Sequence, residues 1–197
     1  MLVSSLSLVA QDNINYDGIL IGAYVPHQIE SIPQSANKML GNKLNQIITA
    51  KGIDYNNYNG SFIITPNIVV LSKDVLPSAP TKLALNLEVT FYIVDGIEGT
   101  VFTSESIAAK GVGTNENKAY IAAMRQIRPK SPILQEFVKK GIKRVIEYYN
   151  NNCSLVLKKV DGLSAQNKYE EALAALAGVP EVSTLSLIHI SEPTRRH

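Results

Sequence analysis

Cysteine, tryptophan and histidine are scarce in this chain of 197 residues. It contains one cysteine, Cys153, no tryptophan and three histidines, of which only His27 precedes the final stretch. A single cysteine excludes a disulfide within the chain and a cysteine-rich zinc site. Cys153 is expected on a helix face or paired with a cysteine outside this chain. We expect no catalytic residue, metal ion or cofactor, since an enzyme would need groups from beyond this chain.

The chain also lacks a strong net charge and a long apolar run. Lys and Arg number 19 and Asp and Glu number 17, which gives a formal net charge of +2. That balance does not by itself favour a nucleic acid or a membrane as partner. No run reaches the roughly 18 apolar residues of a membrane-spanning helix, so we expect no transmembrane segment.

The two ends of the chain differ from the rest. Residues 1–10, with an apolar run up to Val9 and a small residue at Ala10, resemble the end of a secretory signal peptide. They predict a secreted or periplasmic protein. Residues 185–197 begin with LSLIHISEPTR, which matches, residue by residue, the translation of a transposon end and adapter used in sequencing libraries. We interpret this tail as an adapter-derived artefact, with the native protein continuing beyond Thr184.

Hydrophobic patterning predicts an α+β domain over residues 11–130. Apolar residues alternate with others from Leu83 to Val94, which is typical of a strand with one buried face. The spacing of Ala36, Leu40 and Leu44 predicts a helix. Further strands are expected at 18–26, 61–72 and 100–112, a turn at 95–99 and a second helix at 114–128. The order β-α-β-β-β-α favours a largely antiparallel or mixed sheet packed with helices.

A helical extension is predicted over residues 131–184. Apolar residues from Leu134 to Tyr149 form one helical stripe, which continues past Cys153 to Val160. A single helix over 132–160 would be about 40 Å long at ~1.5 Å per residue. A short amphipathic helix follows in KYEEALAALAGVP.

The segment KGVGTNENKAY follows a strand and opens a helix, as a phosphate-binding loop does. Gly111, Gly113, Thr114 and Asn115 are therefore candidates for a small-anion or nucleotide site. Glu116 stands where a third glycine is expected, and no Lys-Ser/Thr pair follows. The other interpretation is a strand-to-helix turn, with a positive φ at one or both glycines and Asn115 as the helix N-cap.

Acidic residues gather on the predicted hairpin, at Glu88, Asp95, Glu98 and Glu105. Two carboxylates perform acid–base chemistry only if they share a site. Asp95 and Glu98 lie in a turn, where such residues are common. Glu88 and Glu105 are expected on the exposed face of the sheet, so the pattern favours structural roles.

Basic residues gather within residues 125–144, where Glu136 is the only acidic residue. Those on the long helix are Lys139, Lys140, Lys143 and Arg144. They stack at helical spacing and form either a solvated face or a surface for an anionic partner. Because no aromatic residue interleaves them for base stacking, we expect no nucleic acid.

The stretch from LEVTFYIVDG to EYYNNNC resembles uncharacterised secreted proteins of Gram-negative gut bacteria, and the resemblance extends over about Ile19 to Pro180. The strand, the GxGxN turn and the helix with Ala119 and Ala123 are also similar to envelope lipoprotein domains. These domains are related to the curli-secretion channel protein and the TolB amino-terminal domain. The resemblance implies a non-catalytic assembly or interaction protein of the envelope.

The segment LVLKKVDGLSAQNKYEEALAAL resembles a tetratricopeptide-type helical hairpin, with Tyr169 and Leu176 at two of its apolar positions. One repeat cannot bury its own faces. The hairpin therefore either packs on the α+β domain or begins a longer array. We predict that it binds a protein partner, with Tyr169, Leu176 and the four basic residues of the long helix as candidate contacts. The oligomeric state stays open.

Overall fold

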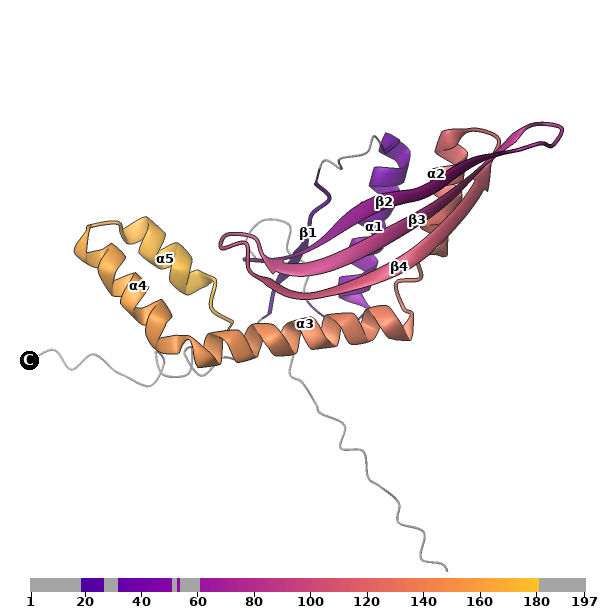
Figure 1. Cartoon of the computed structure of the whole chain (residues 1–197). Coiled ribbons are helices and arrows are strands. Elements are labelled where there is room, and N and C mark those ends of the chain that lie inside the picture. Colours follow the sequence, from indigo (N-terminus) through magenta and orange to yellow (C-terminus); the bar gives the residue numbers. More distant parts are fainter. Residues whose placement is uncertain (1–18, 27–31, 51–52, 54–60, 181–197) are drawn as a thin grey trace, which may run out of the picture.

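A computed structural model describes residues 19–26, 32–50, 53 and 61–180. Within these ranges the elements are β1 (Ile21–Ala23), α1 (Gln34–Thr49), β2 (Phe62–Leu76), β3 (Lys82–Asp95), β4 (Val101–Gly113), α2 (Glu116–Gln126), α3 (Pro132–Asn151), α4 (Cys153–Ala165) and α5 (Tyr169–Ala177). Figure 1 shows their arrangement. The interpretations of residues 1–10, His27 and residues 185–197 fall outside the described residues.

The strands form one mixed sheet in the order β1-β2-β3-β4. β1 runs parallel to β2, with Ile21 opposite Phe62, and the other neighbouring strands are antiparallel. A parallel pair needs a crossover connection, and α1 lies in the crossover between β1 and β2. The α+β class and the mixed, largely antiparallel sheet expected from the sequence are confirmed.

One face of the sheet carries the hydrophobic core. On β3 the buried side chains are Leu85, Leu87, Val89, Phe91 and Ile93. The side chains between them lie on the opposite face, where Glu88 is exposed and Asn86, Thr90 and Tyr92 are half-buried. The apolar sides of α1, α2 and α3 belong to the same buried cluster as these strand residues. The three helices therefore cover one face of the sheet, and no helix of the described ranges lies on the other face (Figure 1).

Helix α2 lies unusually close to β4, and two glycines permit this. A Cβ on Gly111 would stand 2.0 Å from the carbonyl oxygen of Ala119, and a Cβ on Gly113 would stand 2.4 Å from the amide nitrogen of Ala119. The expected positive φ at these glycines is wrong, since among the described glycines only Gly99 has one. Glycine is needed at both positions because backbone atoms of α2 occupy the space that a side chain would fill.

Helix α3 runs along the covered face near β3 and β4. Its predicted apolar stripe is buried, and a Cβ on Gly141 would meet Ile93 Cδ1 at 2.5 Å. The predicted continuation to Val160 is wrong, because α3 ends at Asn151 and α4 begins at Cys153. The Asn152 side chain donates to the carbonyl oxygen of Tyr148 at 2.8 Å. Asparagine side chains compete in this way with the helical hydrogen bonds of the backbone.

Helices α4 and α5 form a hairpin at one end of the molecule (Figure 1). None of the residues of α4 is buried. Val156 and Val179 pack partly against the core, and a Cβ on Gly178 would stand 2.6 Å from Ser61 Oγ. The hairpin therefore touches the body at few points. The division at residue 131 and the tetratricopeptide likeness both stay predictions.

No helix within the described ranges is long and apolar enough to span a bilayer.

The close contact of α2 with β4 predicts a large cost for Gly111→Ala. The new methyl group would clash with backbone atoms of α2, which cannot rotate away as a flexible side chain can. The helix and the strand must therefore move apart. Overpacking of this kind costs about 1–3 kcal/mol or more in the free energy of unfolding. Urea denaturation followed by circular dichroism measures that change.

Gly162→Ala is the matched control, because Gly162 lies within α4 and a Cβ added there would meet no neighbouring atom within 4 Å. There the same methyl group should stabilise by roughly 0.5–1 kcal/mol, as alanine does in a helix interior. A Gly111→Ala protein that is as stable as the wild type would contradict the proposed spacing.

Candidate functional site

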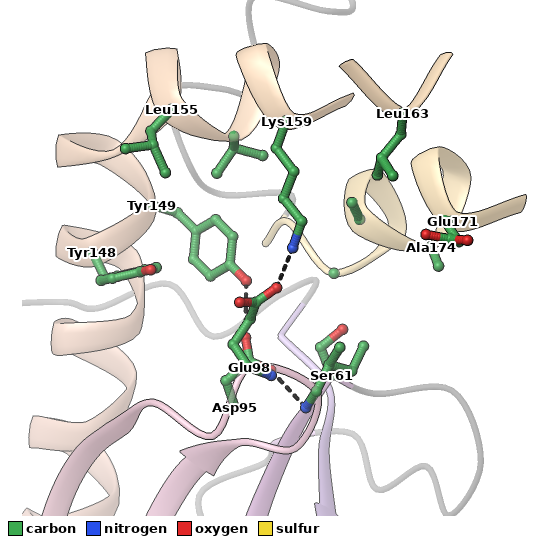
Figure 2. A pocket seen from close by; sticks show the side chains of 14 residues that line it. Ser61, Asp95, Glu98, Tyr148, Tyr149, Leu155, Lys159, Leu163, Glu171 and Ala174 are labelled. Carbon is green, nitrogen blue, oxygen red and sulfur yellow. Dashed lines mark hydrogen bonds and ion pairs between the residues drawn. The ribbon is translucent and has the colours of Figure 1, made fainter. Parts of the chain in front are cut away.

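A cleft of about 300 Å³ lies between the α4–α5 hairpin and the end of the sheet (Figure 2). Its walls come from the β3–β4 turn, the start of β2, the end of α3 and the inner sides of α4 and α5. The lining residues are Ser61, Asp95, Ile97, Glu98, Tyr148, Tyr149, Leu155, Val156, Lys159, Leu163, Glu171, Ala174, Ala175 and Gly178. We take this cleft as the candidate functional site, because segments far apart in the sequence build it together.

Asp95 closes the β3–β4 turn from a buried position. Its carboxylate Oδ1 accepts hydrogen bonds from the amides of Ile97 at 2.8 Å and Glu98 at 2.9 Å. Its other oxygen, Oδ2, accepts one from the Tyr149 hydroxyl at 3.3 Å. The aspartate is 2% exposed, so these donors take the place of water. Asp95 therefore fixes the turn and ties it to α3.

Tyr149 lies at the floor of the cleft and is held on all sides. Its ring packs edge to face against Phe62, with a centroid distance of 5.8 Å, and against Tyr148 at 5.4 Å. Burial, followed by the charge and hydrogen bond of Asp95, raises the pKa of Tyr149 above its ordinary value. The hydroxyl therefore stays protonated and donates to Asp95. Figure 2 shows the hydroxyl pointing at this carboxylate.

An ion pair between Lys159 and Glu98 joins α4 to the β3–β4 turn. The hydrogen bond to Glu98 is the main cause that raises the pKa of Lys159, so the ammonium group stays charged. Both side chains are about half exposed, at 48% and 49%. Exposed pairs contribute only about 0–1 kcal/mol. The pair therefore orients the hairpin more than it stabilises the fold.

Much of the remaining lining is apolar and partly faces solvent, while Glu171, the third carboxylate of the lining, pairs with Lys168 at 3.5 Å. Ile97 is 70% exposed and Leu155 is 62% exposed, and both line the cleft. Val156, Leu163 and the small alanines of α5 continue the apolar wall inward. Apolar side chains that stay exposed around a concavity are typical of a binding site.

Two carboxylates of the cleft already have partners within the fold. Asp95 is occupied by its own turn and by Tyr149, and Glu98 is occupied by Lys159. Within the described residues, no group of three His, Cys, Asp or Glu side chains is placed to hold a metal ion. Cys153 begins α4 and is half-buried as a free thiol; its pairing with an outside cysteine stays a prediction.

The expected placement of Glu88 and Glu105 on one exposed face is wrong for Glu105. Glu88 lies opposite Ala108, whereas Glu105 lies opposite Phe91 on the covered face. β4 is the edge strand of the sheet, so a carboxylate on its covered side still reaches solvent. Glu88 and Glu105 therefore do not share a site, whereas Asp95 and Glu98 both line the cleft.

The predicted partner contacts lie outside the cleft. Tyr169 is 58% exposed and donates to Asn167 Oδ1 at 3.0 Å, and neither it nor Leu176 lines the cavity. On α3, Arg144 donates to the carbonyl oxygen of Phe102 at 2.8 Å, while Lys143 stands 4.0 Å from Glu147. Lys139 and Lys140 lie on the same helix, half-buried and exposed respectively. Binding by any of these residues stays a prediction.

The Gly111–Asn115 turn is built for packing. Asn115 Oδ1 accepts from the amide of Lys118 at 2.9 Å, which confirms the predicted N-cap. Glu116 in the first turn pairs with Lys73 of β2 at 2.8 Å. Gly111 is buried under α2, whereas Thr114 and Asn115 are exposed. A small anion at this turn stays a prediction.

Sequence reasoning missed most of the cleft. Leu155 and Ile97 were overlooked because neither belongs to a long periodic pattern. Lys159 and Glu98 are sixty-one positions apart, and only the fold brings them together. One local signal was present in the sequence. Asp95 precedes a glycine in a predicted turn, and an aspartate at this position commonly accepts hydrogen bonds from the amides that follow it.

The buried Tyr149–Asp95 pair predicts a specific pH dependence. The pKa of Tyr149 in the fold lies above its ordinary value of 10.0. Above that pH the unfolded chain releases this proton while the folded chain keeps it, so stability falls as pH rises. Tyr149→Phe should lower the free energy of unfolding by about 1 kcal/mol at neutral pH and reduce the further loss at alkaline pH. Urea unfolding from about pH 8 to about pH 11 measures both effects.

Tyr169→Phe serves as the control, since it removes an exposed hydroxyl. It should retain the wild-type decline at alkaline pH. If Tyr149→Phe and the wild type lost stability in parallel above the ordinary tyrosine pKa, the assigned role of the buried hydroxyl would be wrong.

Comparison with known proteins gives structural likenesses only. No family model matches the sequence, and no curated protein matches it. A minor lipoprotein from Acinetobacter baumannii is similar to this chain with a TM-score of 0.36 at 16% identity, over 65% of this chain and 92% of that one. A PelC dodecamer from Paraburkholderia phytofirmans is similar with a TM-score of 0.39 at 12% identity, over 64% and 89%. Lipoprotein GNA1162 from Neisseria meningitidis is similar with a TM-score of 0.36 at 11% identity, over 64% and 97%. Structural similarity with TM-scores this low supports no conclusion about function.

Proposed function

We propose that this chain is a non-catalytic interaction protein of the Gram-negative cell envelope, and that the cleft under its α4–α5 hairpin binds an apolar segment of a protein partner. One observation carries the proposal. The cleft is lined mainly by apolar side chains, and Ile97 and Leu155 stay largely exposed at 70% and 62%. Burying such side chains against a partner gains about 25 cal/mol per Å² of apolar surface.

The size and charge of the cleft favour a short apolar segment. A volume of about 300 Å³ lies at the lower end of the range for ligand pockets. It accommodates one or two large side chains. Lys159 and Glu98 already neutralise each other across the wall. A partner with an uncharged apolar anchor therefore fits better than one with an unpaired charge.

The hairpin is suited to adjust around such a segment. It contacts the body through Val156, Gly178 and the solvent-exposed ion pair of Lys159, while α4 buries none of its residues. Elements with few buried contacts open at low free-energy cost. The envelope location rests on the sequence, namely the resemblance to envelope proteins and the signal-peptide-like residues 1–10, and is proposed together with the binding role.

Selection from a random peptide display library on the purified chain tests the binding role. Enriched peptides should carry a large apolar residue, and calorimetry should show binding that Leu155→Glu weakens roughly tenfold. Burial of an unpaired charge in an apolar contact costs more than the approximately 1.4 kcal/mol that a tenfold loss represents.

Ile133→Glu is the matched control, because Ile133 is 57% exposed on α3 and does not line the cleft. It should leave peptide affinity unchanged. Peptides that bind the wild type and Leu155→Glu equally well, or that lose affinity with Ile133→Glu alone, would refute the cleft as the binding site.

A further inference from the structure

Six basic side chains lie along α2 and its flanks, and we refer to them as the α2 stripe. They are Lys43, Lys82, Lys118, Arg125, Arg128 and Lys130. Arg125 lines both of the open hollows that these residues border. One hollow lies between α1 and the α2–α3 connection, and the other lies between α2 and the strand ends at Lys82 and Gly113. The stripe is therefore continuous from one hollow to the next.

In the described part of the chain, no carboxylate pairs with the basic side chains of the stripe. Among the described residues, no Asp or Glu lines either hollow. In the part of the chain that the structure describes, the ion pairs found use Lys73, Lys143, Lys159 and Lys168, all outside the stripe. Lys43 donates to the carbonyl oxygen of Ile127 at 2.9 Å, and Lys118 donates to Thr114 Oγ1 at 3.1 Å. These uncharged acceptors orient the ammonium groups but do not neutralise their positive charge.

The remaining lining indicates which anion fits. Neither hollow is lined by a Phe, Tyr or Trp of the described ranges, so the stripe has no surface there on which bases could stack. Gln46, Thr49 and Thr114 place neutral hydrogen-bonding groups among the cations. Two hollows in series suit a thin chain better than a flat bilayer. A chain with spaced anionic groups and many hydroxyls matches this pattern.

We propose that the α2 stripe binds an acidic polysaccharide. Anionic groups of the sugar chain meet Arg125 and Arg128, and its hydroxyls meet Gln46 and the threonines. This surface is separate from the cleft of the proposed function, since the two share no lining residue. Loss of one binding activity therefore leaves the other intact.

Calorimetric titration with alginate oligosaccharides, which carry carboxylates, tests the proposal. The wild type should bind, and added salt should weaken the binding because the contacts are exposed. The double variant Arg125→Glu, Arg128→Glu should lose at least roughly tenfold in affinity, since two attractions become repulsions. Arg125→Gln with Arg128→Gln should give a smaller loss, and it keeps the test valid if the charge reversal prevents folding.

The matched control is the double variant Lys158→Glu, Lys168→Glu, which changes the net charge equally at exposed positions of the α4–α5 hairpin, outside both hollows and the cleft. It should retain most of the affinity. An equal loss would show attraction by overall charge and overturn the assignment to α2. The proposal also fails if alginate produces no heat, if vesicles of phosphatidylglycerol bind while the oligosaccharide does not, or if single-stranded DNA binds more tightly than the oligosaccharide.

Discussion

The close contact between α2 and β4 determines where the rest of the structure can lie. Gly111 and Gly113 let the helix backbone approach to a distance at which any side chain on the strand would clash. Ala119 and Ala123 are the matching small residues on the helix, and both are fully buried. The position of α2 sets the start of α3, and α3 then follows the covered face to the opposite end of the sheet (Figure 1). The hairpin consequently stands beside the β3–β4 turn.

The two candidate binding surfaces differ in chemistry and in the elements that build them, since the cleft involves the end of α3 and the hairpin whereas the two hollows border α1, α2 and the strand ends. At the hairpin end, Tyr149 donates a hydrogen bond to Asp95, Lys159 pairs with Glu98 and Lys168 pairs with Glu171, so the carboxylates of the cleft have partners and much of the remaining surface is apolar. At the α2 end, the cations lack carboxylate partners among the described lining residues. The net charge of the chain is small, but its charged side chains are unevenly distributed over the surface. Overall composition therefore gave little indication of partners.

Local patterns in the sequence predicted those parts of the fold that short-range physics controls. The alternation from Leu83 to Val94 defines the buried face of β3 whatever lies against it. The spacing of Ala36, Leu40 and Leu44 likewise defines one face of α1. Asn115 caps α2 through a hydrogen bond three residues away. The break at Asn152 was missed because the apolar stripe continues through it, and the side-chain hydrogen bond from Asn152 to the Tyr148 carbonyl is not visible in that pattern.

The sequence by itself determined the β-α-β-β-β-α order of the first elements, the α+β class and the buried faces of β3, α1 and α3, since period and composition act within a few residues. Only the tertiary structure decided that Gly111 and Gly113 serve close packing, and that Leu155 and Ile97 border the same cleft. It also decided that Lys43 and Arg125 flank the same hollow. These relations join residues far apart in the chain. They depend on the path of the backbone in space, which no local pattern records.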